Sequence, residues 1–233
     1  MKFSAPLSLA LAALTSQAAA HYTLPSLIIN GQVTPQWANV RRTNNYNSQA
    51  PVTDVRSADF RCYTSETRAT ASTITVSAGS QIGVVANGNM YHAGVINVYM
   101  ARATNGNAAT FNGDGNVWFK VHQIPAVTNG GSSISWPGSN IDRFTFTLPR
   151  SLPTGEYLIR TEQIALHSAS GFAGAQFYIA CGQLNVINGG SGNLGPLVSI
   201  PGVYTGNEPG ILINIYWPIP ANYTQPGPPV WRG

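Results

Sequence analysis

Short stretches of alternating apolar and polar residues, or of β-branched and aromatic residues, recur along the chain. Such patterns indicate strands, because successive side chains of a strand point to opposite faces. Gly-, Asn- and Pro-rich turns separate the stretches, and no long stretch has a helical period. We therefore predict strands within residues 72–78, 94–103, 143–149, 155–166, 175–187 and 210–217.

Short strands at this spacing predict an all-β fold, an antiparallel β-sandwich of the immunoglobulin or fibronectin III type with long loops and at most short helices. Loops at the ends of such a sandwich can build a site. Residues 21–233 contain no linker-like stretch, so we predict one domain. Its Pro-rich end, residues 218–233, is expected to run extended along the surface.

The first twenty residues have the pattern of a secretory signal peptide. Lys2 precedes an apolar run, and Ala18-Ala19-Ala20 matches the small residues that signal peptidase recognises. The run is shorter than the ~20 apolar residues of a membrane span, and no later segment approaches that length. We expect a secreted protein without a membrane anchor, whose mature chain begins at His21.

Charge and cysteine content narrow the choice of partners and compartment. Only 9% of residues are charged, and the net charge of +4 is scattered without a basic block, which argues against a nucleic-acid partner. Cys62 and Cys181 are the only two cysteines, and outside the cell a disulfide is favoured over two buried thiols. Asn222-Tyr223-Thr224 is a sequon, so Asn222 is a candidate glycosylation site, although it can equally remain unmodified.

His21 gains an unusual donor set if it becomes the first residue. An α-amino group and the imidazole of the same residue can bind one metal together. A third nitrogen from another histidine would give a tetragonal set that suits Cu(II). His92 opens a predicted strand just after a turn and could supply it, although each histidine taken alone is more often incidental.

Gln176, Tyr178 and His167 lie close in sequence to one another. Alternation along the strand places Gln176 and Tyr178 on one face and Cys181 on the other. Taken singly, Tyr178 is equally a core tyrosine, and Gln176 a strand residue bonded to backbone.

Five motifs, in order over nearly the whole mature chain, resemble a known family. They are the cleavage site before His21, "YHAG" at His92, "EQIALHSAS" through His167, "GAQFYIACGQLNV" and "SIPGVYTGNEPGILINIY". Together they are similar to fungal lytic polysaccharide monooxygenases of auxiliary activity family 9, formerly glycoside hydrolase family 61. Two features depart from many members: Val95 stands where proline is common, and a second disulfide is ruled out by the cysteine count.

The resemblance implies one copper ion in a histidine brace. His21 would supply its amino nitrogen and Nδ1, His92 its Nε2, and Tyr178 would lie near the axial position. Gln176 and His167 would assist catalysis by hydrogen bonding beside the metal. The implied activity uses O2 or H2O2 and an external electron donor, either a small reductant or a redox protein such as cellobiose dehydrogenase.

The implied substrate is a polysaccharide, with cellulose as the first expectation and hemicellulose as the second. The short segment 28–45 favours C1 oxidation. Tyr204 matches the aromatic residue on the family's substrate face, and Tyr22 and Trp37 are weaker candidates for sugar contact. We expect a monomer.

Three other functions remain open from the sequence. A non-catalytic carbohydrate-binding β-sandwich would make the histidines incidental. A glycoside hydrolase needs two carboxylates about 5 to 10 Å apart, and no acidic pair is evident in the sequence. A copper-binding protein without catalysis would leave Gln176 and Tyr178 unexplained.

Overall fold

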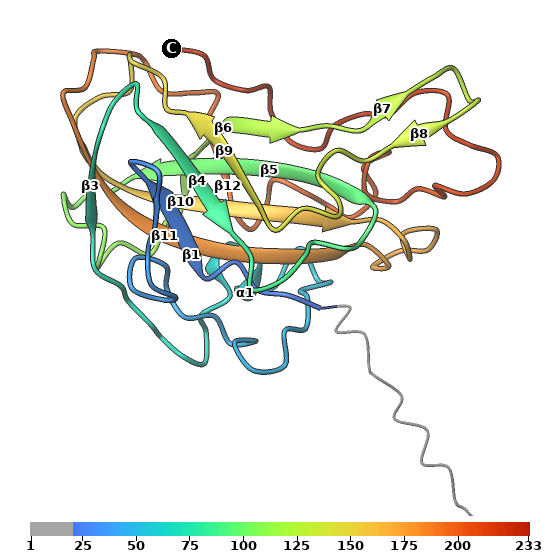
Figure 1. The fold of residues 1–233 in the computed structure, drawn as a ribbon, viewed down its shortest axis with the longest axis horizontal. Helices are drawn as coiled ribbons and strands as arrows, with labels where there is room; N and C mark the ends of the chain where they lie inside the picture. The colour runs from blue at the N-terminus through green and yellow to red at the C-terminus, as the bar shows by residue number, and fades with distance from the viewer. Residues whose placement is uncertain (1–20) are drawn as a thin grey trace, which may run out of the picture.

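The computed structural model describes residues 21–233, so the signal peptide predicted for residues 1–20 lies outside the described part (Figure 1). Two sheets face each other, with strand orders β2-β1-β4-β9 and β12-β6-β5-β10-β11-β3, and a separate hairpin is formed by β7 and β8. The elements are β1 Ser26–Ile29, β2 Gln32–Val33, α1 Asp59–Cys62, β3 Ile74–Ser77, β4 Gln81–Val85, β5 Gly94–Arg102, β6 Asn116–Ile124, β7 Val127–Thr128, β8 Ile134–Ser135, β9 Arg143–Thr147, β10 Gly155–Ala165, β11 Gln176–Ile187 and β12 Val198–Ser199. The predicted β-sandwich with at most short helices is confirmed. Within residues 21–233, no helix has the length and hydropathy of a membrane span.

The central strand β10 brings distant parts of the chain to one end of the sandwich. It is antiparallel to both β5 and β11, and its last residue, Ala165, lies opposite Gly94 and Gln176. The end of β10 and the beginnings of β5 and β11 therefore meet there, together with the residues that flank these strands.

The six-stranded sheet buries both of its faces. Its inner face packs on the four-stranded sheet, and its outer face is covered by α1 and loops. Alternation along each strand divides the side chains: on β10, Tyr157 and Ile159 point inward while Leu158 and Ile164 point outward. Burial on both faces explains why nearly every residue of β5, β10 and β11 is buried, polar residues included.

Five of the six predicted strand ranges contain a strand, namely β3, β5, β9, β10 and β11. The prediction for residues 210–217 is wrong, because this segment forms turns. Ile211 and Ile215 are buried in the outer core, and the backbone bond from Ile213 N to Ala169 O, 2.8 Å long, does not extend into a strand ladder. The sequence analysis missed β1, β4 and β6 among the longer strands.

The C-terminal segment differs in part from the extended surface path we expected. Trp231 is only 7% exposed and joins the inner core, with its ring 5.3 Å from that of Phe119. Its backbone N–H donates to Lys120 O at 2.7 Å. Trp231 therefore packs the C-terminal segment against β6 and the inner core.

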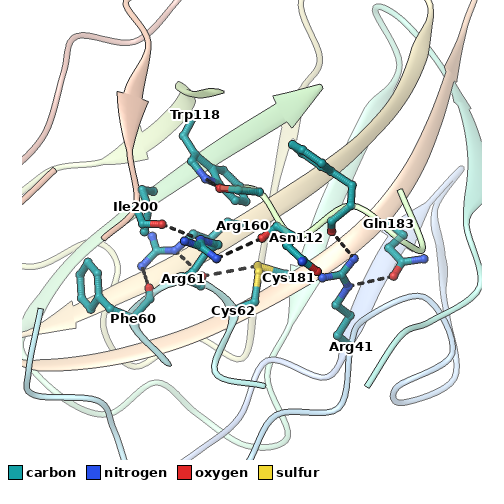
Figure 2. Close-up of a disulfide and its surroundings, with 12 residues drawn as sticks. Arg41, Phe60, Arg61, Cys62, Asn112, Trp118, Arg160, Cys181, Gln183 and Ile200 are labelled. Atoms are coloured by element: carbon teal, nitrogen blue, oxygen red, sulfur yellow. Dashed lines mark hydrogen bonds between the residues drawn. A yellow bond between two sulfur atoms is a disulfide. The ribbon is translucent and has the colours of Figure 1, made fainter. Parts of the chain in front are cut away.

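The predicted disulfide between Cys62 and Cys181 is present and joins α1 to β11 across a separation of 119 residues (Figure 2). Arg160 on β10 donates from Nε to Arg61 O at 2.8 Å and from Nη2 to Phe60 O at 2.8 Å. The disulfide and Arg160 together fasten the short helix to the outer face.

Candidate metal centre

Three rings converge at the end of the sandwich where β10 ends. His21 begins the described chain, His92 precedes β5, and Tyr178 lies near the beginning of β11. Ring centroids are 6.2 Å apart for His21 and His92, 6.3 Å for His21 and Tyr178, and 5.9 Å for His92 and Tyr178. The structure thus gathers around one point three residues that are separated widely in sequence.

Tyr22 holds the neighbouring His21 in place. Its ring stacks on Tyr178 with centroids 4.0 Å apart, and its hydroxyl donates to Gln163 Oε1 at 2.6 Å. Burial raises the pKa of the Tyr22 hydroxyl, so the phenol stays protonated. Because Tyr22 is only 1% exposed, its predicted role as a sugar contact is wrong; the residue packs inward.

The backbone of His92 is fixed by two hydrogen bonds to its carbonyl oxygen. Gln163 Nε2 donates to it at 3.1 Å and Ser139 Oγ at 2.9 Å. The imidazole stacks on His167, with centroids 3.9 Å apart and planes 15° apart. These contacts orient His92 from both its backbone and its ring.

His167 lies at the edge of the site. Burial, together with the charge of His21, lowers the pKa of its imidazole and favours the neutral ring. Its Nδ1 is buried and has no hydrogen-bond partner among the residues the structure describes. Tyr216 donates its hydroxyl to the His167 carbonyl at 3.0 Å and so links a loop to the site.

Gln176 and Tyr178 share one side of β11, as the alternation predicts. The Tyr178 hydroxyl donates to Gln176 Oε1 at 3.1 Å. Burial raises the pKa of Tyr178, which keeps this phenol protonated. The amide oxygen of Gln176 therefore accepts this hydrogen bond, and its Nε2 takes no part in it.

The available donors fit one copper ion. Within residues 21–233 there is no group of three or more His, Cys, Asp or Glu side chains able to hold a metal. Side chains alone thus offer two imidazoles and one phenol, and the amino nitrogen of His21 would add a further donor if His21 were the first residue. Neutral nitrogen donors of this kind suit copper, whereas Mg²⁺ and Ca²⁺ require oxygen ligands.

Tyr204, expected on the substrate face, is 2% exposed. Its hydroxyl donates to Glu162 Oε1 at 2.5 Å and lies 2.7 Å from the Tyr99 hydroxyl. The expectation that it contacts sugar is therefore wrong, because a buried carboxylate holds the phenol on the outer face of the sheet. Trp37 is also unsuitable, since it is half-buried against the inner core.

Exposed aromatic rings near the site come from residues that the sequence analysis passed over. Tyr216 is 63% exposed, Trp217 79% and Tyr91, directly before His92, 51%. The unusual "IYWP" run and the tyrosine next to a candidate ligand were the available signals.

Glu162, the acidic residue that is buried among residues 21–233, is not available for hydrolysis. Glu162 is fully buried and paired with Arg160 at 2.5 Å. Glu208 accepts from the backbone N–H groups of Thr205 and Gly206. The geometry of these acids gives no support to the glycoside hydrolase alternative.

Comparison with known proteins identifies one family. The sequence profile of Auxiliary Activity family 9 (formerly GH61) matches residues 21–223. AA9 family lytic polysaccharide monooxygenase H of Malbranchea cinnamomea is 53% identical over 97% of this chain and 99% of that protein. Monooxygenase C of the same family from Emericella nidulans is 47% identical, over 95% of this chain and 96% of that protein.

Solved structures agree as well. A cellulose-active polysaccharide monooxygenase from M. thermophila superposes with a TM-score of 0.78 at 27% identity, covering 91% of this chain and all of that one, 100%. The extended catalytic domain of H. jecorina LPMO9A gives a TM-score of 0.78 at 29% identity, covering 91% and 92% of the two chains. From the profile match and the relatives together, the chain belongs to auxiliary activity family 9.

Proposed function

We propose that the processed chain is a secreted, monomeric, copper-dependent monooxygenase that cleaves cellulose with oxidation at C1. The observation that carries the proposal is the convergence of His21, His92 and Tyr178 in a family of polysaccharide monooxygenases. Residues 1–20 would be removed as a signal peptide, and residues 21–233 would form the single catalytic domain. Electrons would come from a small reductant or a redox protein.

The amino nitrogen and Nδ1 of His21 and Nε2 of His92 would hold the copper, with the Tyr178 phenol beside it. When bound, copper supplies the one-electron chemistry that activates O2 or H2O2. Tyr22 and Gln163 serve this arrangement indirectly, since they fix the backbone on which both ligands sit.

Gln176 and His167 would act on the oxygen co-substrate. Because Gln176 Oε1 accepts from Tyr178, its Nε2 remains to donate a hydrogen bond. His167 is kept neutral by burial, so its ring can take up or pass on a proton at the edge of the site. The protonated Tyr178 phenol would limit access to the position beside it.

Tyr216, Trp217 and Tyr91 would contact the polymer in place of Tyr204 and Tyr22. Their rings are exposed beside the site and can stack on sugar faces, and the bond from Tyr216 to His167 fixes one ring close to the reacting centre. Cellulose is favoured by the weak charge of the protein and by the cellulose-active relative. Asn222 is exposed on the same C-terminal segment and would carry a glycan.

Product analysis tests this proposal. Processed protein loaded with one equivalent of copper is incubated with cellulose and ascorbate, and products are identified by mass spectrometry. Aldonic acids are expected, and they should disappear in His92→Ala and persist in His122→Ala, whose ring stacks on Phe146 at 4.8 Å as part of a different cluster. Products oxidised only at C4 would contradict C1 attack, and unoxidised sugars released without reductant would indicate hydrolysis.

A further inference from the structure

A network of buried polar side chains lies on the outer face of the six-stranded sheet and takes no part in the metal centre. Its members are fully or almost fully buried: Asn97, Tyr99, Lys120, Arg160, Glu162 and Tyr204. Glu162 is its centre, since Oε1 accepts from Tyr204 and, at 3.0 Å, from Asn97 Nδ2, while Oε2 accepts from Arg160. Buried charges are costly unless they are paired and hydrogen-bonded, so such a network needs a reason.

The network holds both ends of one long loop, residues 204–226, which we call the C-terminal loop. Tyr204 at its beginning bonds to Glu162 and Tyr99. At its end, the Pro226 carbonyl accepts from Lys120 Nζ at 2.7 Å and Asn97 Nδ2 at 3.2 Å. Gln225 Nε2 donates to Asn97 Oδ1 at 2.8 Å, so two successive residues are fixed.

Gly227 shows how closely the end of the loop approaches the network. Its φ of +87° favours glycine, and a Cβ there would collide with the Tyr99 hydroxyl. The end of the loop can therefore lie against Tyr99 only because residue 227 has no side chain.

The middle of the C-terminal loop presents Tyr216 and Trp217 beside the metal centre. Its other contacts with the domain include the buried Ile211 and Ile215, the bond from Ile213 N to Ala169 O, the bond from the Tyr216 hydroxyl to His167 O at 3.0 Å, and the Tyr223 ring on Trp136. Because the loop has no sheet pairing, its position depends on these contacts and on its two anchored ends.

We propose that the buried network positions the C-terminal loop for polysaccharide binding, with Tyr204, Asn97 and Lys120 as positioning residues. The role in binding rests on the proposed function, whereas the hold on the loop does not. By holding both ends of the C-terminal loop, the buried ion pair and hydrogen bonds keep the rings of Tyr216 and Trp217 in place.

The test compares Tyr204→Phe with Tyr157→Phe. Both residues are buried tyrosines, but Tyr204 lies in the C-terminal loop on the outer face, whereas Tyr157 of β10 packs in the inner core and donates to Pro153 O at 2.8 Å. Hydrogen–deuterium exchange of residues 205–224 is expected to accelerate roughly tenfold in Tyr204→Phe and to stay unchanged in Tyr157→Phe. Equal exchange in the two variants would overturn the proposal.

Binding isotherms on cellulose give the second readout. Tyr204→Phe and Tyr216→Ala should each weaken binding roughly fivefold to tenfold, and the double variant should be little weaker than either, because both act through the same loop. The Cu(II) resonance spectrum should remain that of the wild type in Tyr204→Phe. Additive losses, or a changed copper spectrum, would contradict a positioning role.

Gln225→Ala alters a residue that is only partly buried, and it should raise exchange in the same segment. If the wild type neither binds nor oxidises polysaccharide, the proposed function fails. The exchange comparison then still decides whether the network holds the loop.

Discussion

The two faces of the six-stranded sheet are both buried, but they are stabilised differently. The inner face packs apolar side chains against the four-stranded sheet. The outer face mixes apolar residues with a disulfide, an ion pair and several buried hydrogen bonds. The regular inner core specifies the sandwich, whereas the outer face fastens irregular segments that cannot be held by strand pairing.

This difference follows from what each face covers. A second sheet offers its own hydrogen-bonded backbone and needs only apolar contact. Loops present free carbonyl groups, which must find donors when they are buried. Arg160, Lys120 and Asn97 donate to such carbonyls of Phe60, Arg61 and Pro226.

The largest effect on this comparison should come from removing the disulfide. Cys62→Ala/Cys181→Ala releases α1 from β11, and the chain-entropy relation for a separation of 119 residues gives a loss of about 5 kcal/mol in the free energy of unfolding. Urea denaturation of the double variant and the wild type measures it. A loss below about 1 kcal/mol would mean that Arg160 and packing hold the outer face by themselves.

Glu162→Gln should be the next most costly change. It leaves Arg160 buried without a counter-charge, and breaking such a pair costs about 3–5 kcal/mol. Asp142→Asn is the control, because its pair with Arg143 is solvent-exposed and its loss should not measurably change unfolding. Similar results for both variants would show that burial of the pair is unimportant.

Lys120 makes the outer face sensitive to pH. Burial lowers the pKa of its ammonium group to about 8 from 10.5, and Glu162 opposes part of this effect. Below pH 8 the folded and unfolded chains are both protonated, and the cost of burying the charge is fully present. Between pH 8 and 10.5 only the unfolded chain keeps the proton, so this group's contribution makes stability rise with pH.

Relative to Lys120→Met, the wild type should therefore gain about 3 kcal/mol in the free energy of unfolding between pH 7 and pH 10.5. Denaturation curves at several pH values measure the difference between the two proteins. A difference that is constant with pH would show that Lys120 has an ordinary pKa.

The smallest effect is expected on the inner face. Ile159→Val removes one buried methyl group and should cost about 1 kcal/mol. Exchange of residues 205–224 should not change, because Ile159 contacts the inner core alone. Faster exchange in this variant would mean that the two faces are coupled through β10.

Sequence reasoning predicted the regular parts well. Strands β5, β9, β10 and β11 follow from alternation and β-branched content, and the common side of Gln176 and Tyr178 follows from strand period. The sequence analysis missed β1 because "SLII" is buried at every position and does not alternate. Residues 210–217 look like a strand, but within residues 21–233 they pair with no strand.

The roles of individual tyrosines were harder to predict, since they depend on partners far along the chain. The buried Tyr204 donates a hydrogen bond to Glu162, 42 residues away in sequence, and the buried Tyr22 donates one to Gln163, 141 residues away. Neither partner is evident from local sequence. Two of the aromatic rings that are exposed beside the site, Tyr216 and Trp217, lie in a segment that the sequence pattern predicts to be a strand.

The central claim is that His21, once it is the first residue, holds copper together with His92. Electron paramagnetic resonance of the processed chain with one equivalent of Cu(II) tests it most directly, beside a chain that keeps Ala20 before His21. We predict a single axial signal with nitrogen couplings in the processed chain and its loss in the extended chain. The same spectrum from both chains would contradict a role for the amino nitrogen of His21 and, with it, the proposed function.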